Sequence, residues 1–74
     1  MSTDTKFKAA AKQGARDFNE MPEREKWDAH DDLVLGCFNG QIWYEACGHD
    51  DAPPKGWRTG FGEAADMWAM SIHG

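Results

Sequence analysis

Four side chains near the middle of the chain have the chemistry of zinc ligands: His30, Asp32, Cys47 and His49. Imidazole, carboxylate and thiolate groups bind zinc in tetrahedral sites. The spacings His-x-Asp and Cys-x-His match no familiar zinc motif, so a site requires a fold that joins the two pairs. A zinc-stabilised module is therefore an alternative function, and the leading expectation is a protein without a cofactor.

The same residues could form a thiol–imidazole pair for nucleophilic catalysis, with Cys47 beside His49 or His30. The sequence shows no glycine-framed nucleophile turn and no segment typical of an oxyanion hole. A chain of 74 residues also leaves little room for a closed substrate pocket. We therefore expect that the protein is not an enzyme.

An antiparallel β-hairpin over 32–48 is predicted to position these residues. Two runs rich in apolar residues flank Asn39-Gly40, a pair that favours the type I′ turn of a two-residue hairpin. The resulting register predicts a core face of Leu33, Leu35, Cys37, Ile42, Tyr44 and Ala46. The other face carries Asp32, Val34, Phe38, Trp43, Glu45 and Cys47. Extended outward, this register also places His30 opposite His49.

Helices are predicted on both sides of the hairpin. Apolar residues at helical spacing indicate helices over 5–21 and 61–72, and Pro22 followed by two glutamates favours the start of a short helix over 22–29. Residues 56–60 are left open as a third, edge strand. The expected fold class is α+β, a small two-layer domain over 1–74. In it the hairpin packs against the N- and C-terminal helices, and residues 1–4 form a flexible N-terminus.

The charge pattern bears on the class of partner. Thirteen acidic and eight basic residues give a net charge of −5. Residues 27–54 contain no Lys or Arg, and their acids are Asp28, Asp31, Asp32, Glu45, Asp50 and Asp51. A surface of this kind repels nucleic acid and suits a basic protein. The chain also has one basic segment, near the N-terminus, which contains Lys6, Lys8, Lys12 and Arg16.

The predicted register places Trp43 and Phe38 on an exposed face with Val34, beside Asp32 and Glu45. Aromatic side chains with a polar rim are typical of protein–protein hot spots. The sequence thus predicts a non-enzymatic protein that occludes a larger, basic partner, with carboxylates in place of phosphates if that partner binds nucleic acid. The expected contact residues are Trp43, Phe38, Val34, Glu45, Asp28, Asp31, Asp32, Asp50 and Asp51. A homodimer that buries Trp43 mutually is a further alternative.

The short length, acidity and four tryptophans resemble those of small phage or mobile-element accessory proteins. That resemblance implies a protein that blocks a host protein. No apolar run approaches the roughly 18 residues of a membrane span, and residues 1–6 lack an apolar signal core. We therefore expect a cytoplasmic protein that contacts neither a membrane nor nucleic acid directly.

Overall fold

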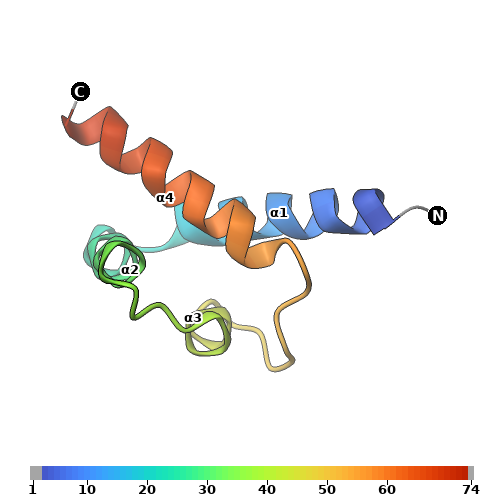
Figure 1. The fold of residues 1–74 in the computed structure, drawn as a ribbon. Helices are drawn as coiled ribbons and strands as arrows, with labels where there is room; N and C mark the ends of the chain where they lie inside the picture. The colour runs from blue at the N-terminus through green and yellow to red at the C-terminus, as the bar shows by residue number, and fades with distance from the viewer. Residues whose placement is uncertain (1–2, 74) are drawn as a thin grey trace.

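The computed structural model describes residues 3–73, and the regular structure in this range is entirely helical. Its helices are α1 (Thr3–Glu20), α2 (Glu23–Leu35), α3 (Gly40–Ala46) and α4 (Trp57–His73). The two long helices α1 and α4 cross each other, and α2 and α3 lie together on one side of the pair (Figure 1). Because residues 3–73 contain no strand, the predicted α+β fold is wrong.

The crossing of α1 and α4 depends on glycine. A Cβ atom on Gly14 would fall on the backbone carbonyl of Trp57, and one on Gly60 would fall on the carbonyl of Ala11. The absence of side chains at these positions lets the two backbones approach directly. The helix predicted over 5–21 is confirmed by α1. The helix predicted over 61–72 is confirmed within α4, which begins earlier, at Trp57.

Aromatic side chains fill the core where these helices meet. Phe18, Trp57 and Phe61 are the largest fully buried side chains. The ring of Phe18 meets that of Phe61 edge-on, with centroids 5.3 Å apart, and Trp57 stacks on Phe61 at 4.8 Å. Tyr44 brings α3 into the core by packing edge-on against Trp57 at 5.0 Å. A small core is thus made mainly of large rings.

Helix α2 begins after Pro22, as expected, but it continues past residue 29 to Leu35. Its first turn contains Glu23 and Glu25, which suit the positive end of a helix. It ends at Gly36, whose φ of 80° is a left-handed cap, with its N–H donated to the carbonyl of Asp32. The first half of the predicted first strand, 33–35, is therefore the end of a helix, and 36–38 belong to the linker.

Helix α3 replaces the predicted turn and second strand. The side chain of Asn39 caps this helix by accepting a hydrogen bond from the N–H of Ile42 at 3.1 Å. Gly40 is the first helical residue and is not among the glycines with positive φ. Asparagine is favoured both in tight turns and at helix N-caps, so the Asn-Gly pair fits either structure. The hairpin and its register are therefore wrong.

The third strand left open over 56–60 is also wrong, because this segment starts α4. The positive φ of Gly56, 98°, turns the chain immediately before the helix. Of the predicted N-terminal segment 1–4, residues 1–2 lie outside the described residues, and residues 3–4 belong to α1. None of the helices within 3–73 is both long enough and apolar enough to cross a bilayer.

Candidate interaction surface

The four candidate zinc ligands have separate environments. His30 lies beside the packed rings of Trp27 and Trp68, with centroids 6.2 and 6.4 Å away. Asp32 accepts a hydrogen bond from the indole of Trp43. Cys47 contacts the sulfur of Met21, and His49 pairs with Asp17. Within the described residues no three His, Cys, Asp or Glu side chains form a group that could hold a metal ion. The register that joined the four residues is absent because α2, the linker 36–39 and α3 take the place of the hairpin.

Asp17 is a buried carboxylate that the sequence analysis did not single out. Its Oδ2 accepts a hydrogen bond from Trp57 Nε1 at 2.8 Å and pairs with His49 Nε2 at 2.9 Å. Its Oδ1 accepts from Gln13 Nε2 at 2.8 Å. One signal was available: Asp17 stands among the apolar positions of its helix, between Gly14 and Phe18. Three partners satisfy this charge, so the arrangement holds the loop after α3 onto α1.

Cys47 borders this buried centre and is poorly suited to nucleophilic attack. Burial raises the pKa of its thiol to about 11, and the negative charges of Asp17, Glu25 and Glu20 add to the effect. A thiol with this pKa is protonated at neutral pH, whereas the nucleophile is the thiolate. The thiol of Cys47 donates a weak hydrogen bond to the Met21 sulfur at 3.9 Å. The arrangement therefore provides no activated thiol at this position.

Phe38 and Trp43, predicted to lie together, do so in the structure. Their rings are parallel, with centroids 6.5 Å apart, and both pack against Phe61 of α4. The indole Nε1 of Trp43 donates to Asp32 Oδ2 at 3.0 Å, which ties α3 to α2. Both rings are half-buried. The pair thus joins the linker 36–39 and α3 to α4.

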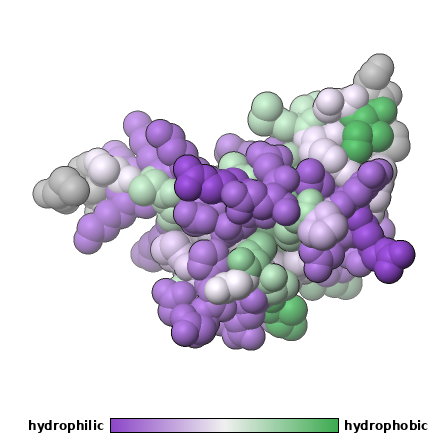
Figure 2. Space-filling model, turned by 180° about the vertical axis from the view of Figure 1, so that it is seen from behind, coloured by the Kyte–Doolittle hydropathy of each residue, from purple (hydrophilic) through white to green (hydrophobic). Residues whose placement is uncertain are grey.

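Three large aliphatic side chains are exposed on either side of the linker 36–39. Val34 and Leu35 end α2 with exposed fractions of 68% and 74%, and Ile42 in the first turn of α3 is 62% exposed. The predicted register placed Leu35 and Ile42 in the core, which is wrong. We call this surface the α2–α3 corner and define it as Val34, Leu35, Phe38, Ile42 and Trp43. Seen from behind, hydrophobic atoms lie at the lower edge over α3 (Figure 2).

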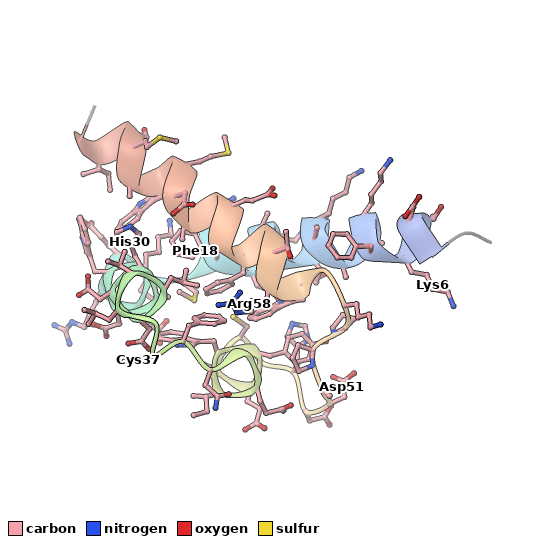
Figure 3. All side chains as sticks on the ribbon, viewed as in Figure 1. Lys6, Phe18, His30, Cys37, Asp51 and Arg58 are labelled. Carbon is pink, nitrogen blue, oxygen red and sulfur yellow. The ribbon has the colours of Figure 1, made fainter. Side chains whose placement is uncertain are left out.

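Acidic residues extend from the corner in two directions. Asp28 and Asp31 precede Leu35 by seven and four residues on α2, so they share its outward face. Glu45 is exposed on α3 and accepts a hydrogen bond from Gln41 Nε2 at 2.8 Å. Asp50 and Asp51 follow in the loop, and Asp51 lies on the opposite side of α3 from Cys37 in the view of Figure 3. The exposed acids therefore lie on α2, on α3 and in the loop that follows α3.

Arg58 brings a positive charge that was not anticipated at this surface. It belongs to the first turn of α4, and its guanidinium lies 5.3 Å from the centroid of the Phe38 ring. Beside it is a hollow of about 430 Å³ whose wall includes Val34, Arg58 and Asp66. The absence of bases from 27–54 therefore does not make the corner purely acidic. The guanidinium of Arg58 covers one side of the Phe38 ring.

Comparison of the chain with protein-family models, with curated proteins and with solved structures finds no match.

Proposed function

We propose that this chain is a small acidic, non-enzymatic binding protein that docks its α2–α3 corner onto a basic surface of a larger protein and occludes it. The observation that carries this proposal is the exposure of Val34, Leu35 and Ile42 around the half-buried Phe38–Trp43 pair. Exposed aliphatic side chains beside packed aromatic rings are typical of the centre of a protein interface.

The acidic edge supports a basic partner. Asp28, Asp31 and Glu45 are exposed beside the corner, and Asp50 and Asp51 extend the negative charge into the loop after α3. Charges at the rim of an interface mainly accelerate encounter, whereas buried apolar contacts slow dissociation. For a partner that binds nucleic acid, the carboxylates take the place of phosphates, and occlusion then blocks that site.

A cytoplasmic setting is part of the proposal. Both Cys37 and Cys47 are free thiols, which suits a reducing compartment. Short length, acidity and high tryptophan content favour the phage or mobile-element accessory type, in which a small protein inhibits a larger host protein.

The test compares variants of the corner with a matched variant elsewhere. The tagged chain and its variants are used to capture proteins from the native host, and the affinity of the captured protein is then measured by titration. We expect Val34→Ser combined with Ile42→Ser to raise the dissociation constant by roughly tenfold or more, because two apolar side chains leave the interface. Met70→Ser is the control, because Met70 is 66% exposed on α4 and should leave the affinity unchanged.

Charge variants test the second part of the proposal. Asp28→Asn combined with Asp31→Asn should slow association more than it speeds dissociation, and added salt should have a smaller effect on this variant than on the wild type. Circular dichroism checks that each variant keeps its helices. Equal affinity of folded corner variants and wild type would exclude the corner as the binding surface. Capture of an acidic protein would contradict the electrostatic part.

A further inference from the structure

A second apolar surface lies between α1 and α4, and Glu63 on its edge also lines the hollow beside the α2–α3 corner. A groove of about 340 Å³ is lined by Ala15 of α1 and by Ala64, Met67 and Trp68 of α4. Met67 is 67% exposed and Met70, on the same helix, is 66% exposed. Hydrophobic atoms also gather at the C-terminal end of α4 in the view from behind (Figure 2). The surface therefore combines an apolar hollow with an apolar projection.

Opposite charges flank this groove. Lys12 shares a helix face with Ala15, three residues away, and is exposed. On the other side Glu63 lines the groove and is exposed. Among the described residues the salt bridge found joins His49 and Asp17, so Lys12 and Glu63 have no ionic partner in this part of the chain. One rim thus offers a cation and the other an anion.

We propose that this face binds a second copy of the chain in a two-fold dimer. Met67 of each copy enters the groove of the other, and Glu63 of each copy faces Lys12 of the other. A two-fold interface must be complementary to itself, and a face with a projection, a hollow, a cation and an anion meets that condition. A nucleic acid or an anionic membrane would complement Lys12 alone and would be repelled by Glu63.

The solvent-accessible surface area of the chain supports dimerisation. Its accessible surface is 5101 Å², whereas a compact monomer of 8.3 kDa is expected to expose roughly 4,600 Å². The surplus of about 500 Å² is a large part of the roughly 800 Å² that each partner buries in a standard interface. The C-terminal end of α4 projects beyond α1 and α2 (Figure 1).

The experiment measures the mass of the wild-type chain by light scattering and sedimentation equilibrium, from the micromolar to the millimolar range. We expect a mass that approaches twice 8.3 kDa as the concentration rises. Lys12→Glu and Glu63→Lys should each raise the dimer dissociation constant by roughly tenfold, because each places like charges together at two symmetric positions. The double variant should restore dimerisation, because it exchanges the two charges.

Apolar variants provide a matched pair. Met67→Ser should weaken the dimer to a similar degree, and Ile42→Ser, 62% exposed at the α2–α3 corner, should leave it unchanged. Circular dichroism establishes that each variant is folded. A mass of one chain at every concentration would overturn the proposal. So would failure of the folded double variant to restore the dimer, because general destabilisation is not repaired by a charge exchange.

Discussion

Asp17 joins three parts of the chain through single hydrogen bonds. Gln13 precedes it by one helical turn, His49 comes from the loop after α3, and Trp57 opens α4. Hydrogen bonds to an ionised group are stronger than those between neutral groups, and a buried carboxylate without them would be costly. This side chain therefore fixes the position of a loop that has little regular structure of its own.

Replacing Asp17 should reveal this role. We expect Asp17→Ala to lower the free energy of unfolding by about 2–4 kcal/mol, because the indole of buried Trp57 then lacks its acceptor and His49 loses its partner. The measurement is urea-induced unfolding followed by circular dichroism. Lys8→Ala, an exposed change on the same helix, serves as the control and should stay within about 0.5 kcal/mol. Similar effects of the two changes would show that the buried hydrogen bonds contribute little.

Cys47 predicts how stability depends on alkaline pH. The pKa of its thiol is about 11 in the folded chain, raised by burial from an ordinary value of 9.0. The folded state thus holds the proton more tightly than the unfolded state. The stability linked to this group is complete below pH 9 and is lost as the pH rises from 9 towards 11. The pKa of Tyr44 is also raised, by burial and then by Asp51, so its ionisation acts in the same direction.

The pH prediction is checked by urea unfolding at intervals from below pH 9 to about 11. Stability should fall with pH in the wild type and less steeply in Cys47→Ala, because that variant has no thiol to ionise. Cys37→Ala changes an exposed thiol and should leave the slope of the wild type unaltered. Parallel curves for wild type and Cys47→Ala would mean that this thiol does not account for the loss.

At the scale of elements, the close crossing of α1 and α4 is the main organising contact. Gly14 and Gly60 each face the backbone of the opposite helix, whereas a Cβ on Gly62 would meet nothing within 4 Å. Glycine normally weakens a helix interior by about 1 kcal/mol relative to alanine. At Gly14 and Gly60, the close packing of α1 on α4 therefore excludes the alanine that helix propensity alone would favour.

Alanine substitutions separate the two effects. Gly14→Ala should lower the free energy of unfolding by about 1–3 kcal/mol, because the new methyl group meets the carbonyl of Trp57 and forces the helices apart. Gly62→Ala, in open space on α4, should raise it by about 0.5–1 kcal/mol through helix propensity alone. Thermal and urea unfolding measure both variants. Stabilisation by Gly14→Ala would show that the crossing is looser than the structure indicates.

At the scale of the whole molecule, basic and acidic residues lie in different regions. Lys8, Lys12 and Arg16 are exposed along α1, while acids dominate α2, α3 and the following loop. The labelled side chains of Lys6 and Asp51 come from these different regions (Figure 3). The proposed partner surface at the α2–α3 corner and the proposed dimer surface at α1 and α4 use different residues. The two proposals can therefore fail independently.

Local pattern alone was sufficient for the helices at the two ends of the chain. The apolar spacing of 5–21 and 61–72 repeats at helical period over several turns, and Pro22 with two glutamates marks the start of α2. The proximity of Phe38 and Trp43 was also anticipated, although from a hairpin that does not exist. In the structure, the linker and α3 bring both rings onto Phe61.

The tertiary structure decided what lies between these helices. The segment 33–47 contains short apolar runs that suit a strand or a helix, and Asn39-Gly40 suits a turn or a helix cap, so local preference could not choose. Contacts with residues far along the chain resolve this, as when Tyr44 packs on Trp57 and Trp43 on Phe61. The same distant contacts bury Asp17 and bring Arg58 onto Phe38. Such effects depend on packing in three dimensions, which the order of residues in one segment does not specify.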